Sequence, residues 1–392
     1  MRLKDVCNVF LDGDWIENKD QSPAGIRLIQ TGNIGNGIFL EKKERARFIS
    51  EETFARLKCN EIFPGDILVS RLPDPIGRAC IIPDTDERMI TAVDCTICRV
   101  DKSMILPEFL CYFMRSAMYY NAIMENVTGT TRKRISRKNL GNVNVRLFPL
   151  DDQQAIVHKL DYITKIIKLR KKELAQLDYL IKARFIELFG DPKINDKSWD
   201  IGIISDYYEV KGGKRIPKGM GYTDAITTHP YLRASDMKNG TIIDDDIHYI
   251  DDEVYEHIKR YIVNGGDVYL TNVGVNLGMA GVIPDKYDGA NLTENAVKLV
   301  PKKHNTIDGI FLSHYINSRG IQNYINERKM AVGVPKLAIF RIETMPILLP
   351  PPKLQKLFAD FVHQVDKSKA AVQKALDETQ LLFDSLMQEY FG

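Results

Sequence analysis

The sequence repeats itself with a period near 200 residues, and this repeat fixes the architecture before any single motif is considered. The matching segments are residues 3–6 with 204–207, 13–16 with 213–216, 62–67 with 262–268, and 77–84 with 278–285. Both halves then pass through a strand pattern and a helix pattern, and each ends in a long helical stretch closed by Phe-Gly. A chain of 392 residues gives each half enough residues for its own core. We therefore predict two similar domains.

Each predicted domain, 1–150 and 191–350, has the pattern of short strands joined by turns. Asn36-Gly37 and Asn239-Gly240 are typical of hairpin turns. Apolar residues at helical spacing predict one helix inside each domain, at about 107–126 and 309–328. The strand-helix alternation of a nucleotide-binding sheet is missing from both, so the predicted fold class is α+β.

Two long helices are predicted, over 151–190 and 351–392, because the first is almost free of proline and glycine and the second follows Pro350-Pro351-Pro352. Apolar residues step by alternating four and three, which is typical of a coiled-coil seam. In the first helix the seam is Ile156, Leu160, Ile163, Ile167, Arg170, Leu174, Leu177, Ile181, Arg184 and Leu188. In the second it is Leu354, Phe358, Phe361, Val365, Ser368, Val372, Ala375, Thr379, Leu382 and Leu386.

An ordinary amphipathic helix packed on its own domain is the alternative interpretation of each stripe. Length argues against it, because about 37 residues make a rod of roughly 55 Å, longer than such a domain is wide. The simplest arrangement pairs the two helices antiparallel within the chain, with the globular domains at opposite ends.

All six cysteines fall in the first 111 residues, and Cys95 and Cys98 form a lone CxxC. One such pair is half a zinc site. The repeat places the two cysteines opposite Val297 and Val300, which favours a packing role. The net charge of +2 gives no sign of a nucleic-acid partner, and the absence of a membrane span or a signal peptide predicts a cytoplasmic protein.

This organisation resembles the specificity subunit of type I restriction-modification systems, and the resemblance covers the whole chain. It is carried by the Pro-Gly-Asp-Ile and Gly-Gly-Asp-Val strand entries, by Ile-Pro-Asp at 82–84 and 283–285, by the loop 129–136 and its counterpart 333–337, by Lys-Gly-Gly-Lys-Arg-Ile-Pro at 211–217, and by the joints 148–150 with Gln153-Gln154 and 349–352 with Gln355.

The resemblance implies two target-recognition domains that each bind one half of a bipartite double-stranded DNA site. The helices would dock methyltransferase subunits and set the gap between the half-sites. Those partners methylate adenine with S-adenosylmethionine, and a restriction subunit cleaves as an ATP- and Mg²⁺-dependent motor. This chain is then expected to be non-catalytic and to hold no cofactor or metal.

The residues agree with a non-catalytic chain, since neither an amino-methylation motif nor a GxxxxGK[ST] loop is present. Pro83-Asp84 resembles the start of a nuclease motif, but its recurrence at Pro284-Asp285 indicates a strand-ending turn. A scaffold or regulatory protein that uses the same helices to bind proteins is the alternative function.

DNA contacts are predicted in two basic clusters, for which an ordinary solvated loop is the alternative interpretation. The first comprises Thr130, Thr131, Arg132, Lys133, Arg134, Arg137 and Lys138, and the second Lys211, Lys214, Arg215 and Lys218, with Lys336 in the repeat of the first loop. In the first domain Asp14-Trp15 replaces Lys214-Arg215, which weakens the case for a phosphate contact there. Candidate base readers are Gln30, Asn33, Arg71, Arg233, Asp236, Asn272 and Asn276.

Overall fold

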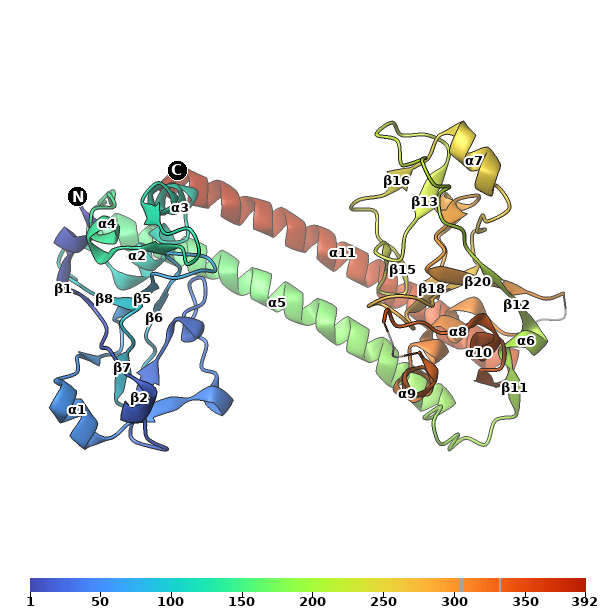
Figure 1. Ribbon diagram of the computed structural model, residues 1–392, viewed down its shortest axis with the longest axis horizontal. Helices are drawn as coiled ribbons and strands as arrows, with labels where there is room; N and C mark the ends of the chain where they lie inside the picture. The colour runs from blue at the N-terminus through green and yellow to red at the C-terminus, as the bar shows by residue number, and fades with distance from the viewer. Residues whose placement is uncertain (304–305, 331–332) are drawn as a thin grey trace. The chain divides into compact units, whose positions relative to one another are not determined.

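The computed structural model describes residues 1–303, 306–330 and 333–392, and these form two compact units. Unit 1 comprises Met1–Lys171 and Gln373–Gly392, and unit 2 comprises Lys172–Val372. Each unit therefore combines one globular region with a section of both long helices, α5 (Leu150–Phe189) and α11 (Pro352–Phe391) (Figure 1).

Unit 1 is built on two four-stranded sheets, ordered β1-β8-β5-β6 and β3-β2-β7-β4. Its strands are β1 (Cys7–Asp12), β2 (Ile26–Ile29), β3 (Arg47–Ile49), β4 (Glu61–Ile62), β5 (Ile67–Ser70), β6 (Ala79–Ile81), β7 (Met89–Thr91), β8 (Cys95–Val100), β9 (Val127–Thr128) and β10 (Arg134–Ile135). Its shorter helices are α1 (Glu51–Leu57), α2 (Pro107–Phe113), α3 (Ala117–Met124) and α4 (Arg137–Gly141).

Unit 2 repeats this plan with the sheets β12-β20-β17-β18 and β16-β13-β19. Its strands are β11 (Ile201–Ile203), β12 (Tyr208–Gly212), β13 (Pro230–Leu232), β14 (Met237–Lys238), β15 (Thr241–Ile242), β16 (His248–Tyr249), β17 (Val268–Thr271), β18 (Ala280–Val282), β19 (Asn291–Leu292), β20 (Ala296–Pro301) and β21 (Pro346–Leu348). Its shorter helices are α6 (Ile204–Tyr207), α7 (Asp252–Ile258), α8 (Gly309–Ile316), α9 (Arg319–Arg328) and α10 (Ile339–Glu343).

The sequence repeat is a structural repeat down to single hydrogen bonds. The side chain of Gln153 accepts from the Leu106 N–H (2.9 Å) and donates to the Phe148 carbonyl (2.8 Å). Gln355 makes the same two bonds at the start of α11, at 2.8 and 2.7 Å. Both glutamines are buried, so each ties the first turn of a long helix to its domain. The prediction of two similar α+β domains is confirmed.

The register of the repeat corrects one prediction. Cys95 pairs with Ser70, and Ala296 pairs with the corresponding Thr271, so Cys95 and Cys98 match Ala296 and Leu299 and not Val297 and Val300. The packing interpretation is unaffected, because both thiols are fully buried and burial raises the pKa of Cys98 well above its usual range. A thiol in this state is a small apolar side chain.

The single helix predicted inside each domain is two helices. In unit 1 the chain turns after α2, and the side chain of Ser116 accepts from the Tyr119 N–H, which starts α3 as an N-cap. In unit 2, α8 ends at Ile316 and α9 begins at Arg319. The apolar spacing continued across the break, which concealed it.

The two predicted hairpin turns differ. Asn239 and Gly240 both have positive φ, 55° and 76°, and join β14 to β15 as a two-residue turn. Around Asn36-Gly37 only the isolated bridge between Ile34 and Phe39 forms, so this turn closes no strand pair.

The long helices pair antiparallel within each unit, as predicted. In unit 1 Lys159 donates to the Tyr390 hydroxyl (3.3 Å), while Arg170, further along α5, contacts Thr379. In unit 2 Asp178 forms an ion pair with Lys369 (2.7 Å). The alternative interpretation holds as well, because the same helix sections complete the core of each unit.

The buried stripe departs from the predicted seam toward the chain end of each helix. Leu382 is 51% exposed, while its neighbour Phe383 is buried, and Phe185 is buried beside the half-buried Arg184. An α-helix has 3.6 residues per turn, so a strict 3.5-residue seam drifts around it once packing on a domain takes over. Buried seam residues are Ile156, Leu160, Ile163, Ile181, Phe358, Val365 and Thr379, and half-buried ones are Ile167, Arg170, Leu174, Leu177, Arg184, Leu188, Leu354, Phe361, Val372, Ala375 and Leu386.

Phe391, the penultimate residue, is expected to contribute strongly to the stability of unit 1. Its ring packs against Phe109 at 5.1 Å between centroids and against Phe113 at 6.2 Å. Phe391→Ala should lower the free energy of unfolding of unit 1 by about 3–5 kcal/mol, measured by urea titration. The exposed Glu389→Ala is the control, and equal midpoints for the two variants would show that α11 is not part of this core.

Candidate nucleic-acid interface

One edge of the main sheet in unit 1 gathers several loops. The pairs Asp12–Thr96 and Ser70–Cys95 place the ends of β1 and β5 and the start of β8 at this edge. We call the loops that meet there, 13–16, 71–78, 92–94 and 128–134, rim 1. The same edge in unit 2 carries rim 2, formed by 213–216, 272–279, 293–295, 330 and 333–336.

The two rims share a backbone framework. Asp14 N–H donates to the Thr91 carbonyl and Lys214 N–H to the Leu292 carbonyl, both at 2.8 Å. The glycine before each is required, because a Cβ on Gly13 or Gly213 would overlap carbonyl oxygens of the facing loop. Two further backbone hydrogen bonds recur in both rims. In rim 1 the Arg71 N–H donates to the Asp94 carbonyl, and the Ile135 N–H donates to the Arg71 carbonyl. In rim 2 the Asn272 N–H donates to the Asn295 carbonyl, and the Leu337 N–H donates to the Asn272 carbonyl.

The basic loop of rim 1 is a short hairpin of β9 and β10 followed by α4. Its predicted DNA-contacting side chains, Thr130 to Arg134 with Arg137 and Lys138, are all exposed. Asp94 lies beneath the tip, 3.6 Å from Arg132 and 4.0 Å from Arg134. The loop therefore presents concentrated positive charge, which one carboxylate partly offsets.

The second predicted cluster lies on β12 and the segment after it. Lys211 pairs with Glu209 (2.8 Å), the ammonium of Lys214 lies 5.8 Å from the Tyr261 ring centre, and Lys218 is exposed. A hollow of about 270 Å³ beside Lys211 is also lined by Arg260 and Lys298. These two cations were missed from the sequence because they lie on segments distant from the cluster along the chain.

Arg71 and Asn272, predicted as base readers, have structural roles. They occupy equivalent positions and are 3% and 5% exposed. The guanidinium of Arg71 donates to the Val93 carbonyl (2.6 Å) and lies 3.3 Å from Asp12, while the Asn272 amide is 3.4 Å from the Leu337 carbonyl. Burial leaves both side chains almost inaccessible to a ligand in this structure, so base reading by them is not supported.

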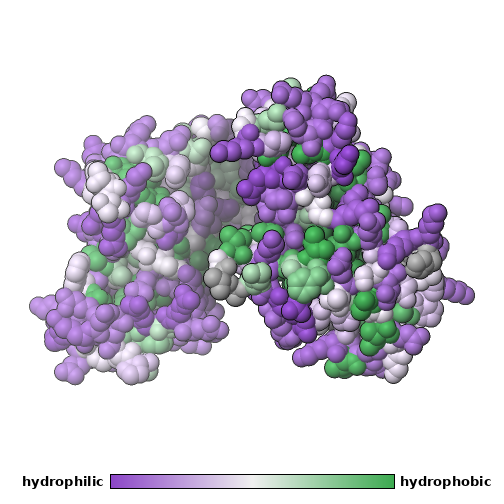
Figure 2. Space-filling model, turned by 45° about the vertical axis from the view of Figure 1, so that its right-hand side comes forward, coloured by the Kyte–Doolittle hydropathy of each residue, from purple (hydrophilic) through white to green (hydrophobic). Residues whose placement is uncertain are grey.

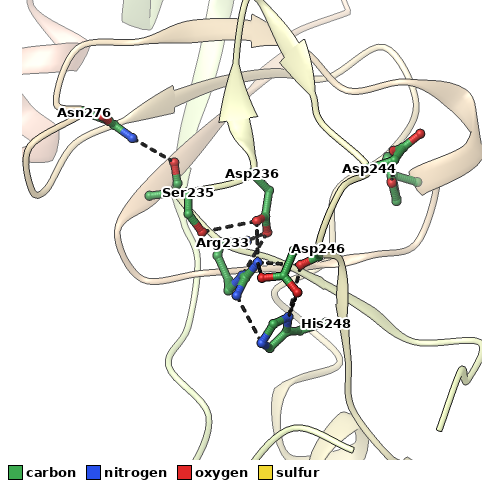
Figure 3. A network of polar contacts seen from close by, with 9 residues as sticks. Arg233, Ser235, Asp236, Asp244, Asp246, His248 and Asn276 are labelled. Carbon is green, nitrogen blue, oxygen red and sulfur yellow. Dashed lines mark hydrogen bonds and ion pairs between the residues drawn. The ribbon is translucent and has the colours of Figure 1, made fainter. Parts of the chain in front are cut away.

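Arg233 and Asp236 are likewise committed to an internal network (Figure 3). The Arg233 guanidinium donates to the buried Asp236 (2.7 Å), to Asp246 (3.0 Å) and to the His248 ring (3.1 Å). These carboxylates raise the pKa of Arg233 and lock its position. The network anchors the loop after β13, and base reading by these two residues is not supported.

The side-chain amides of Asn33 and Asn276 also contact nearby backbone groups. Asn33 accepts from the Gln30 N–H (3.0 Å) and donates to the Leu40 carbonyl (2.9 Å), and Asn276 is within 3.4 Å of the Ala234 carbonyl. Gln30 is half-buried and remains a candidate. Lys336 lies on rim 2, where its backbone pairs with Met330, and it is exposed.

Exposed apolar side chains on both rims were missed. Trp15 is 70% exposed on rim 1, and Val275, Met330 and Val334 are exposed on rim 2. Figure 2 shows apolar residues gathering on the face of unit 2 turned to the viewer, whereas hydrophilic residues cover its upper part. The two rims therefore share a framework and differ in the chemistry they present.

The family model that describes the type I restriction modification DNA specificity domain matches residues 1–179 and 196–379. The chain therefore belongs to the family of type I restriction-modification DNA specificity subunits, which are non-catalytic. The scaffold alternative finds no support. Among the described residues, no group of three or more His, Cys, Asp or Glu is arranged to hold a metal ion, and no helix is long and apolar enough to cross a membrane.

Two curated relatives illustrate the match. The chain is 23% identical to a putative type I restriction enzyme MjaX specificity subunit from Methanocaldococcus jannaschii, over 95% of this chain and 89% of that one. It is 21% identical to the type I restriction enzyme EcoBI specificity subunit from Escherichia coli, over 70% and 63%.

Solved structures share the fold. An S subunit of a type I restriction-modification system from M. genitalium superposes with a TM-score of 0.58 at 15% identity, covering all of this chain and 95% of that one. A chain from a structure on the assembly and conformational transition of the type I R-M system has a TM-score of 0.58 at 17% identity, covering 100% and 96%.

Proposed function

We propose that unit 1 and unit 2 each read one half of a bipartite double-stranded DNA site through rim 1 and rim 2. The observation that carries this proposal is the pair of rims: the same hydrogen bonds hold both backbones, while the exposed side chains differ at matching positions. Two copies of one framework with different surfaces suit the reading of two different half-sites. The exposed cations of both rims would contact phosphates and fix the orientation.

Binding of duplex DNA at increasing salt tests this proposal. The complex of this chain with its methyltransferase partner should bind a duplex that carries its site, and log affinity should fall linearly with log salt concentration. A complex that binds no duplex, or binds without salt dependence, would favour the scaffold function instead.

The long helices are proposed to dock the methyltransferase subunits and to set the gap between half-sites. The buried seam residues are less suited to docking, because they already pack within the chain. Exposed apolar residues on the outer faces of α5 and α11 are the better candidates: Tyr162, Leu169, Tyr179, Leu180, Ile186, Leu357, Leu381 and Leu382. S-adenosylmethionine, ATP and Mg²⁺ would be bound by the methyltransferase and restriction subunits, and the assembly would work in the cytoplasm.

Leu381, 72% exposed on α11, is expected to matter for assembly and not for folding. Leu381→Asp should weaken association with the methyltransferase subunit by roughly 10-fold or more, because a charge would be buried at the interface. Glu378→Ala, an exposed change one turn away, is the matched control. Association is measured by gel filtration of the complex and by a binding titration with the methyltransferase subunit. If both variants bind this subunit with equal affinity and co-elute with it equally, the docking face lies elsewhere.

A further inference from the structure

Arg215 and Glu294 form an exposed ion pair on rim 2. The Nε of Arg215 donates to Glu294 Oε1 at 2.5 Å, and the Thr293 hydroxyl donates to Oε2 at 3.2 Å. The carboxylate is thereby fixed from both sides, and its hydrogen bond with Arg215, together with its negative charge, raises the pKa of Arg215. Within the described residues, the Nη atoms of Arg215 donate no hydrogen bond, so the fork of this guanidinium is free for a ligand.

The backbone hydrogen bonds of rim 2 hold the Arg215–Glu294 ion pair at the protein surface. Lys214 is held by its bond to the Leu292 carbonyl, and the Arg215 side chain is 78% exposed. Arg215 and Glu294 line an open cleft of about 430 Å³ together with Tyr222 and Asn295. The cleft lining also includes Arg233, which its own network immobilises. A ligand in the cleft would therefore meet a donor fork beside a fixed acceptor.

This arrangement complements one base pair in particular. In the major groove guanine offers two adjacent acceptors, O6 and N7, and its cytosine partner offers the N4 amino donor. The guanidinium fork matches the two acceptors, and the carboxylate matches the donor. A backbone phosphate fits less well, because Glu294 would repel it.

Unit 1 carries a different pair at the same two positions. The counterparts of Arg215 and Glu294 are Trp15 and Val93, since Gly13 and Cys95 hydrogen-bond as Gly213 and Ala296 do. Trp15 directs its one donor to Glu17 (3.3 Å). An indole and an isopropyl group cannot make the contacts described above, so the two rims must treat the equivalent base pair differently.

We infer that Arg215 and Glu294 together read one G·C base pair in the half-site bound by unit 2. The inference rests on the proposed function, because it assumes that rim 2 enters a DNA groove. Beyond the proposed function, the inference names the base pair that Arg215 and Glu294 recognise.

Mapping of methylated adenines tests the inference with the complex of this chain and its methyltransferase partner. Arg215→Ala should make one half of the bipartite motif degenerate at a single G·C position and leave the other half and the gap unchanged. Glu294→Ala should relax the same position. The double variant R215W/E294V, which carries the residues of rim 1, should also lose the preference for G·C there.

A duplex with 7-deazaguanine at that position supplies a second readout, because it lacks the N7 acceptor but pairs normally. Wild-type methylation of this duplex should fall by at least about 5-fold, because one of the two hydrogen bonds of the bidentate contact is lost while O6 still accepts, and Arg215→Ala should be insensitive to the replacement. Lys218→Ala is the control for a phosphate contact, because loss of such a contact should lower the methylation of all DNA sequences equally.

The inference is overturned if Arg215→Ala lowers methylation of every site equally with the motif intact, if it changes nothing, or if the two alanine variants relax different positions. These outcomes differ from a failure of the proposed function, in which the wild-type complex would methylate no bipartite motif.

Discussion

Replacing Arg132, Lys133 and Arg134 together with alanine is expected to weaken DNA binding on the order of 10- to 100-fold at moderate salt, for every sequence alike. Phosphate contacts release counterions, and removal of one such cation lowers the slope of log affinity against log salt by about 0.9, so removal of all three would lower it by ~2.7. The fold should persist, because all three side chains are exposed. Titration of the assembled complex against duplexes at several salt concentrations provides the measurement.

Asp94 offers a matched control for the charge argument. It lies within 4.0 Å of both Arg132 and Arg134 and offsets part of their charge. Asp94→Asn should therefore strengthen binding and leave the three cations in place. If the triple variant keeps the wild-type affinity and salt slope, the loop is an ordinary solvated surface and rim 1 contacts DNA by other groups.

Lengthening both long helices is expected to change the gap between half-sites and not their sequences. Four residues inserted near Gln176 of α5 would extend the rod by about 6 Å, nearly two base pairs at about 3.4 Å each. The facing position of α11 needs the same insertion, because Arg170 contacts Thr379 and Asp178 pairs with Lys369 across the two helices. Four residues fit the seam as a stutter.

The readout is the spacing between methylated half-sites in the reconstituted complex. Insertion in α5 alone is the control, and it should reduce assembly or activity because the antiparallel contacts on one side would be out of register. A doubly extended variant that is folded, active and restricted to the original gap would show that these helices do not set the spacing.

The long helices were predictable from sequence because their signals are local. A stretch without glycine or proline and a recurring apolar step mark a helix wherever its partner lies. The face it buries depends on the partner, which is why Phe383 and not Leu382 is covered. The break between α2 and α3 was missed because Ser116 acts as an N-cap within a continuous apolar pattern.

The candidate site was harder to predict, because a polar side chain on a loop has the same sequence signature whether it reads DNA or supports the loop. Arg71 and Arg233 find carbonyl and carboxylate partners on other segments of the chain. Glu294 is a candidate base-reading residue only because of its ion pair with Arg215, which the sequence does not show. By contrast, the sequence repeat and its glycine- and lysine-rich segments did indicate approximately where the rims lie along the chain.

The most direct test of the central claim is the methylation map of a host strain with and without this chain. Co-expression with the methyltransferase partner should yield methylated adenines in one bipartite motif, two short specific sequences separated by a fixed gap of unspecified bases, and the motif should vanish when this chain is removed. A motif that persists without the chain, or the appearance of a single uninterrupted motif, would contradict the account.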